Sequence, residues 1–168
     1  MKKYVPFASL GCLILFALNI NAQTKKPIVE NSDTSKYTIE NCINKFSIKK
    51  TESIEKTAAG YQYWFVDPAF ADGKTLKMSI VAPHSATHPP HVHGEDEFFF
   101  ILEGKAELYF KGQWTPAEPY TSFYCPSNVE HGIRNAGDTE LKYLVIKKYD
   151  DTNPVRVEFN RRVKAGPR

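Results

Sequence analysis

The sequence predicts an all-β fold, either a sandwich or a barrel of short strands. From Tyr37 onward, short runs rich in aromatic and β-branched residues recur along the chain. Segments containing Gly, Asp or Asn, which favour turns, separate these runs. We find no long stretch with helical periodicity and no internal repeat. These observations favour many short strands joined by tight turns.

The expected strands can be located individually. The aromatic run at residues 61–66 stops at Asp67-Pro68, and residues 76–81 alternate apolar and polar side chains as a half-buried strand does. The other expected strands lie at residues 97–102, 106–110, 122–125, 141–149 and 155–159. Turn segments at residues 71–73, 103–104, 111–112 and 136–138 separate them.

Length and charge limit the possible functions. The 168 residues suffice for one domain with its own core, and 24% of them are charged. The formal net charge is +3, and two of the cationic residues, Lys2 and Lys3, lie in a segment that we expect to be removed. The rest is nearly neutral and has no basic stripe, so we do not expect a nucleic acid as partner.

The N-terminus resembles a secretory signal peptide, which we place at residues 1–22. Two lysines precede a mostly apolar run at residues 5–20, and cleavage after the small residue Ala22 would leave Gln23 first. A retained membrane anchor is the alternative, but the run falls short of the ~20 residues that a span needs. We therefore expect an exported protein, periplasmic or secreted, without a stable membrane span after cleavage.

Export would expose the mature chain to oxidising conditions. Cys42 and Cys125 could then form a disulfide, or they could be two buried free thiols. We expect a flexible lead at residues 23–36, a barrel domain at residues 37–160 and a basic C-terminal tail at residues 161–168.

Four residues predict a metal site. His91 and His93 are two apart, so on an extended chain their imidazoles share one face. Glu97 follows after a possible bend at Gly94, and its even offset returns its carboxylate to that face. His131 is distant in sequence, but a barrel can bring it opposite the other three. Three imidazoles and one carboxylate suit one divalent transition metal: Fe, Mn, Ni, Co or Zn.

The same residues resemble the two sequence motifs of the cupin superfamily. His91, His93, Glu97 and Gly104 match the first motif, and residues 126–135 resemble the second, with His131 as its ligand. Small single-domain bacterial cupins have a similarly short segment between their motifs. The differences lie at non-ligand positions: Ser85 and Tyr120 stand where a Gly is frequent, and Asn128 replaces the turn Gly. Asn tolerates left-handed backbone angles.

The resemblance implies a double-stranded β-helix barrel, the cupin or jelly-roll fold, which is often dimeric. In that fold Phe99 and Ile101 would point inward with Glu97. Phe98, Phe100 and Leu102 would then form a second apolar face that needs cover. The cover could come from N-terminal strands or from a second subunit, and we expect a homodimer.

Candidate catalytic and substrate-binding residues surround the expected metal site. His88, just before the ligand segment, could act as a general base, as could His84, although both could be exposed loop histidines. A phenol such as Tyr63 could donate to a substrate oxygen, although core packing would explain it equally well. Candidates for substrate binding are Gln62, Tyr124 and Tyr143.

A fold does not define a function, and the superfamily includes enzymes and binding proteins. We expect an exported metal-dependent enzyme that acts on a small oxygen-rich molecule, a sugar or a uronic- or keto-acid derivative. The reaction would be an isomerase- or lyase-type proton transfer at the metal. The alternatives are an Fe(II) dioxygenase and a non-catalytic module that binds a sugar or another small ligand.

Overall fold

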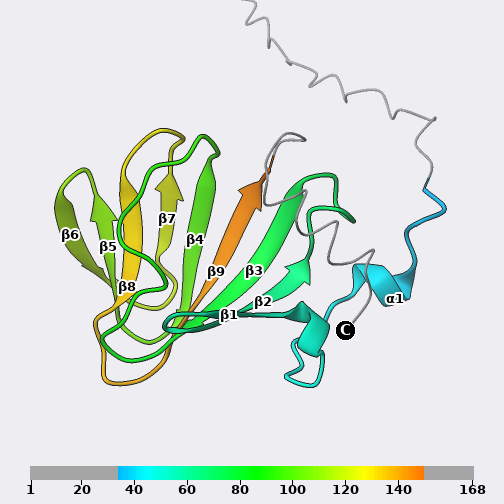
Figure 1. Ribbon diagram of the computed structural model, residues 1–168, viewed down its shortest axis with the longest axis horizontal. Helices are drawn as coiled ribbons and strands as arrows, with labels where there is room; N and C mark the ends of the chain where they lie inside the picture. The colour runs from blue at the N-terminus through cyan, green and yellow to red at the C-terminus, as the bar shows by residue number, and fades with distance from the viewer. Residues whose placement is uncertain (1–33, 150–168) are drawn as a thin grey trace, which may run out of the picture. The chain divides into compact units, whose positions relative to one another are not determined.

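The computed structural model describes residues 34–149, which form two antiparallel sheets (Figure 1). Helical structure in this range is confined to α1 (Ile39–Cys42) and a 3-10 turn at Thr51–Ser53. The strands are β1 (Ile54–Thr57), β2 (Gly60–Val66), β3 (Lys74–Val81), β4 (Glu97–Glu103), β5 (Ala106–Phe110), β6 (Gln113–Ala117), β7 (Ser122–Cys125), β8 (His131–Asn135) and β9 (Leu141–Lys148).

The two sheets enclose one core. The larger sheet has the strand order β1-β2-β3-β9-β4-β7, and the smaller one has the order β6-β5-β8 (Figure 1). Each sheet contributes buried residues to a shared cluster that includes Phe99 and Ile101 from β4 and Leu108 and Ile133 from β5 and β8. The all-β expectation is therefore confirmed, and the arrangement fits a cupin-type jelly-roll barrel.

Most of the expected strands are present with shifts of a residue or two. The strands at residues 106–110 and 122–125 have the expected bounds. Sequence patterns did not identify β1, β6 or β8. Pro116 interrupts the pattern of β6, where it is tolerated because β6 is an edge strand. β1 is a short, half-polar edge strand, and Gly132 weakens the strand signal of β8.

Strand β3 departs from the half-buried strand that its alternation predicts, because both of its faces are covered. Lys77 and Ser79 are buried and share the inward face with Val81. On the other face, Met78 pairs with Tyr63 of β2. The Tyr63 ring packs 4.9 Å from Phe46, so the segment before β1 covers this part of the sheet.

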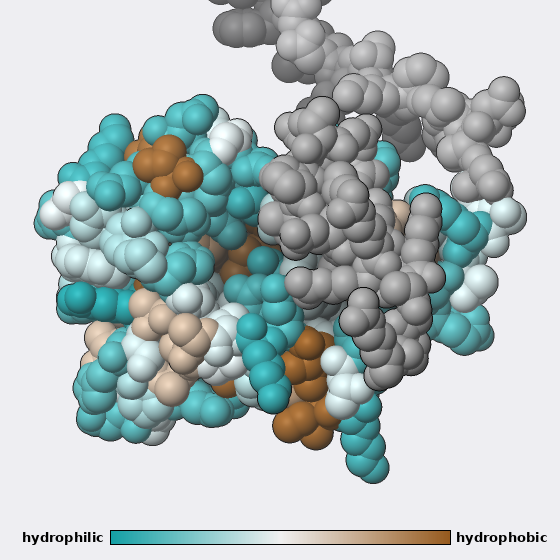
Figure 2. Space-filling model, viewed as in Figure 1, coloured by the Kyte–Doolittle hydropathy of each residue, from teal (hydrophilic) through white to brown (hydrophobic). Residues whose placement is uncertain are grey.

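The outer face of β4 is only partly covered. Phe99 and Ile101 point inward with Glu97, as expected. Phe98, Tyr124 and Ile146 are neighbours across β4, β7 and β9, and their exposed fractions are 47%, 49% and 46%. A second subunit would cover these side chains, and the homodimer stays a prediction. The face shown in Figure 2 is mainly hydrophilic, with a few separate hydrophobic residues, as is ordinary for a protein surface.

Several expectations fall at the ends of the chain. The signal peptide, most of the lead, the strand at residues 155–159 and the basic tail lie outside the described residues. Between residues 34 and 149, no helix has the length and apolar character to cross a membrane. Cys42 is an exposed free thiol and Cys125 a buried one, so the structure does not pair them.

Asn135 fastens β8 to the larger sheet. Its buried side-chain amide lies within hydrogen-bond distance of the carbonyl oxygens of Val81, Ala82 and Thr139, at 3.0, 3.0 and 2.7 Å. Its side-chain oxygen accepts from the backbone N–H of Gly137. This asparagine therefore fixes a turn and joins the two sheets.

Replacing Asn135 with Ala should lower the free energy of unfolding by about 3 kcal/mol, because buried carbonyl groups would lose their donor. Urea unfolding measures the change. Asn44→Ala, at a partly exposed residue whose amide donates to the carbonyl of Asn41, is the control and should change it by about 1 kcal/mol or less. Equal effects of the two substitutions would contradict this role.

Candidate metal centre

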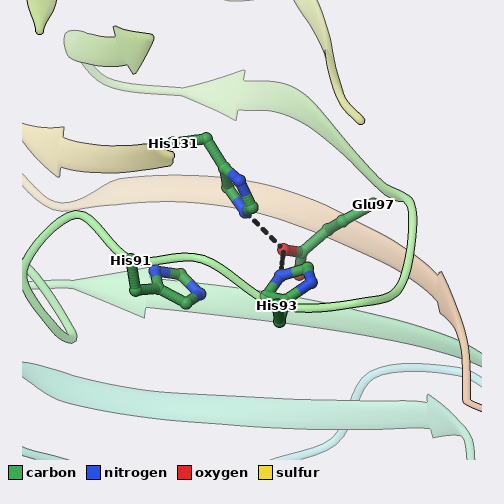
Figure 3. A group of neighbouring side chains, drawn as sticks. All are labelled: His91, His93, Glu97 and His131. Atoms are coloured by element: carbon green, nitrogen blue, oxygen red, sulfur yellow. Dashed lines mark hydrogen bonds and ion pairs between the residues drawn. The ribbon is translucent and has the colours of Figure 1, made fainter. Parts of the chain in front are cut away.

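Four side chains from both sheets converge at one point (Figure 3). Glu97 begins β4 of the larger sheet, His131 begins β8 of the smaller one, and His91 and His93 lie in the loop that leads to β4. Each residue offers one ligand atom, and these atoms all lie within 4.8 Å of one another. We call His91, His93, Glu97 and His131 the four-residue cluster; it could hold a metal ion.

A backbone bridge brings the distant His131 to the cluster. The N–H of His91 donates to the carbonyl of His131 at 3.0 Å, and the N–H of His131 donates to the carbonyl of His91 at 3.1 Å. This pair is an isolated bridge, so His91 and His93 lie on an extended loop and not on a regular strand. The alternation survives because the loop is extended: Val92 is exposed, while both neighbouring histidines are partly buried.

The turn of the second motif holds the same loop from the other side. The N–H of Asn128 donates to the carbonyl of His93 at 2.8 Å. Asn128 has a φ of 60°, which agrees with the left-handed conformation expected where a Gly is frequent. Tyr120, at another position where a Gly is frequent, has a φ of 68°. These two residues adopt the backbone angles that explain why Gly suits their positions.

Hydrogen bonds orient two imidazoles toward the carboxylate. Oε2 of Glu97 lies 3.0 Å from Nε2 of His93 and 3.3 Å from Nε2 of His131. Nδ1 of His131 lies 2.7 Å from the carbonyl oxygen of Val129. A carbonyl only accepts, so Nδ1 carries a proton, and Nε2, which donates to Glu97, would bind a metal once it has released its own proton. Fixing the tautomer through the remote ring nitrogen is typical of metal-binding histidines.

The electrostatics of the site favour a bound cation. Burial alone would raise the pKa of Glu97, but hydrogen bonds from His131 and His93, together with Lys147 and Lys77, hold that pKa well below its usual range. Burial and the neighbouring histidines lower the pKa of His91 to about 4. At neutral pH the cluster therefore offers a charged carboxylate and, at His91, a neutral imidazole.

The residues fit a divalent transition metal. Nδ1 of His91 and Nδ1 of His93 are buried and have no hydrogen-bond partner among the described residues. Such orphaned atoms are unfavourable unless a ligand or water satisfies them. Three imidazoles and one carboxylate are the donor set that Fe, Mn, Ni, Co and Zn accept. Four protein ligands would leave positions open on a six-coordinate ion.

Three of the other candidate residues lie on the same side as the cluster. The exposed ring of His88 packs 4.3 Å from the ring of His91, at the rim. Gln62 shares the inward face of the larger sheet, where its amide donates to Ser79. Tyr143 is buried on that face against Phe99, and burial raises its pKa to about 12.

The structure does not bring Tyr63 and Tyr124 to the cluster. The hydroxyl of Tyr63 donates to the carbonyl of Lys45, and its ring packs on the outer face. Tyr124 pairs with Phe98 on the outer face of β4, one residue out of phase with Glu97. Side chains alternate along a strand, so neither phenol points inward with Glu97. His84 lies in an exposed contact with Asp138 instead.

Sequence patterns missed two inward-facing lysines, Lys77 and Lys147. Lys147 lies directly across from Glu97 in the pairing of β9 with β4. Lys77 lies on β3, two residues from Ser79 and four from Val81 on the same face. The two-residue alternation of β9 could have identified Lys147, because Tyr143, Val145 and Lys147 are two residues apart and share the inward face of this strand. The alternation in β3 predicts that its polar residues face solvent, and this prediction is wrong for Lys77 and Ser79, which are buried.

Comparisons with known proteins agree with this geometry. A family model described as a cupin domain matches residues 77–147, which include the whole four-residue cluster. An uncharacterized protein of Aquifex aeolicus (strain VF5) is 31% identical over 72 residues, covering 42% of this chain and 60% of the relative. The match thus spans less than two thirds of that relative.

Solved structures resemble the chain at low identity. An RmlC-like cupin from Shewanella frigidimarina NCIMB 400 has a TM-score of 0.51 at 16% identity, covering 64% of this chain and 92% of its own. The plu4264 protein from Photorhabdus luminescens has a TM-score of 0.53 at 17% identity, with coverages of 73% and 97%. KdgF from Halomonas sp. has 0.52 at 16%, with coverages of 64% and 97%. At these identities the likeness concerns the fold alone.

His93→Ala should lower the metal content of the purified protein by about tenfold or more, because it removes one of four ligands. Elemental analysis of protein dialysed after metal loading gives the stoichiometry. His84→Ala removes an imidazole that lies in an exposed contact and should leave about one ion per chain. Undiminished metal content in His93→Ala would show that the cluster is not the binding site.

Proposed function

The chain belongs to the cupin superfamily, and from that premise we propose that it is a metal-dependent enzyme acting on a small oxygen-rich substrate. The observation that carries the proposal is the convergence of the four ligand atoms within 4.8 Å, in a part of the barrel where Glu97 and His131 are buried. A bound divalent metal would supply a Lewis acid that polarises a substrate carbonyl or hydroxyl.

The reaction that we propose is an isomerase- or lyase-type proton transfer. His88 stands at the rim with its ring against His91, where an exposed imidazole can move a proton between substrate and solvent. Its Nδ1 lies 3.2 Å from the carbonyl of Pro89, a contact that would leave Nε2 for the substrate. Phe99 and Ile101 lie beyond Glu97 on β4, where they exclude water from the interior.

Gln62 and Tyr143 are the inward-facing groups that we propose to contact substrate. Gln62 presents a polar amide from β2, and Tyr143 presents a phenol from β9. A sugar, or a uronic- or keto-acid derivative, carries the oxygen atoms that such groups bind. We also propose that the protein is exported, on the basis of its N-terminal sequence, so that the substrate would be met outside the cytoplasm.

Iron chemistry is the second candidate function, because three histidines and one carboxylate suit Fe(II) as well as Mn, Ni, Co or Zn. A dioxygenase would need oxygen for every turnover, whereas a proton transfer would not. A non-catalytic binding protein would bind its ligand and release it unchanged. These three functions therefore differ in oxygen consumption and in whether product forms.

Protein loaded separately with Mn, Fe, Co, Ni or Zn should convert a sugar, uronic acid or keto acid at equal rates with and without oxygen. NMR measures the rate of product formation in air and in an anaerobic chamber. Chelation should abolish turnover, and His88→Gln should lower kcat by about 10²-fold at unchanged metal content. Turnover that strictly requires oxygen would replace the proposal with the dioxygenase, and ligand binding without product would replace it with the binding protein.

A further inference from the structure

We propose that Lys77 and Lys147 form an anion subsite that binds a carboxylate group of the substrate on the inner face of the larger sheet. The inference deepens the proposed function, on which it rests, by naming the chemical class of the substrate. Neither lysine belongs to the four-residue cluster.

The strand pairing places both lysines on the side of the sheet that carries Glu97. Lys147 pairs directly with Glu97, so their side chains stand on the same face. Lys77 pairs with Val145, which is two residues from Lys147 on β9 and belongs to the buried core. On the next strand, Trp64 of β2 pairs with Lys77. The two ammonium groups thus lie on adjacent strands beside the candidate metal centre.

Lys77 is a buried cation without an ion-pair partner among residues 34–149. Only 8% of the residue is exposed. Its Nζ donates to Oε1 of Gln62 at 3.2 Å and lies 4.8 Å from the centre of the Trp64 ring. A neutral amide and an aromatic face orient an ammonium group but do not neutralise it. Burying an unpaired charge is costly, so this side chain is prepared for an anion.

The surroundings of Lys77 are consistent with that interpretation. Burial lowers the pKa of Lys77, while the charges of Glu97 and Glu55 act in the opposite direction. Glu55 accepts a hydrogen bond from Nε1 of Trp64 at 3.0 Å, which holds its carboxylate at the indole. A substrate carboxylate at Lys77 would supply the close negative charge that this position lacks.

Among residues 34–149, the ion pair that Lys147 makes is a loose one. Its side chain is 9% exposed, and its Nζ lies 3.6 Å from Oε2 of Glu95, beyond an ordinary charge-assisted hydrogen bond. Its Nζ also lies 5.2 Å from the centre of the Tyr149 ring. A bound carboxylate could approach this ammonium group more closely than Glu95 does.

Charge balance favours a singly charged anion. With a divalent ion bound, Glu97 would offset one of its two charges and leave one. Lys77 and Lys147 add two positive charges to the interior, and Glu95 and Glu55 add two negative charges, so these four contribute no net charge. One net positive charge then remains in the interior, which matches a carboxylate better than a doubly charged phosphate. An α-hydroxy acid or a uronic acid could place one oxygen at the metal and its carboxylate at the lysines.

Matched ligands test the subsite directly. Isothermal titration of zinc-loaded protein would compare D-glucuronate with D-glucose and lactate with propane-1,2-diol, since each pair differs by a carboxylate in place of a CH₂OH group. Inorganic phosphate serves as the doubly charged probe. At least one acid should bind tenfold or more tightly than its neutral partner. Equal affinities within both pairs, no binding by either acid, or preferred binding of phosphate would overturn the proposal.

Lys77→Met keeps the length of the side chain and removes its charge, and Lys147→Gln is the second variant. Each should weaken acid binding at least tenfold while the zinc stoichiometry stays at that of the wild type. Lys74→Met, at an exposed residue of the same strand, should have no effect.

Thermal unfolding separates binding from a structural role. Lys77→Met should leave the melting temperature unchanged or raise it, because it removes a buried unpaired charge. Undiminished acid binding in both Lys77→Met and Lys147→Gln would overturn the subsite. If the wild-type protein does not retain zinc, the result contradicts the proposed metal-dependent function instead. Failure of the subsite and failure of the proposed function are therefore distinguishable.

Discussion

The structure of the site depends on one constraint: Glu97 is a carboxylate buried inside the barrel, and its charge must be compensated there. Two imidazoles, His93 and His131, point their Nε2 atoms at one of its oxygens. Each comes from a different part of the chain, so their meeting requires the two sheets to close. The paired backbone hydrogen bonds between His91 and His131 and the amide of Asn135 supply that closure. The fold and the site thus stabilise each other.

Much of this arrangement follows from sequence. In the fold that the resemblance implies, Phe99 and Ile101 point inward with Glu97, and the structure agrees because side chains alternate along β4 from its first residue. The four members of the cluster were identified from their types and spacing, and the structure brings them together. The local structure differs from a regular strand, since His91 and His93 lie in an extended loop. The two-residue spacing still worked because extended chain alternates its side chains whether or not it pairs in a sheet.

The remainder could not be predicted, because it depends on what covers each sheet. Lys77 and Ser79 suggested a solvent face, yet a barrel interior that holds a metal centre and a polar ligand needs such groups inside. Tyr63 and Tyr124 have the right chemistry, but each lies out of phase with the residues that face the cluster. Phase within one strand can be read from sequence. To know which phase faces inward, the partner strands must be known as well, and some of these are distant in sequence, as β9 is from β3.

The account makes the four-residue cluster the centre of the protein's chemistry, and X-ray diffraction at the absorption edge of the bound metal tests that claim most directly. Crystals of protein purified with its own metal should show one anomalous peak, about 2.0–2.2 Å from nitrogen atoms of His91, His93 and His131 and from an oxygen of Glu97. A peak elsewhere in the molecule, or none in crystals soaked with Mn, Fe, Co, Ni and Zn in turn, would contradict it.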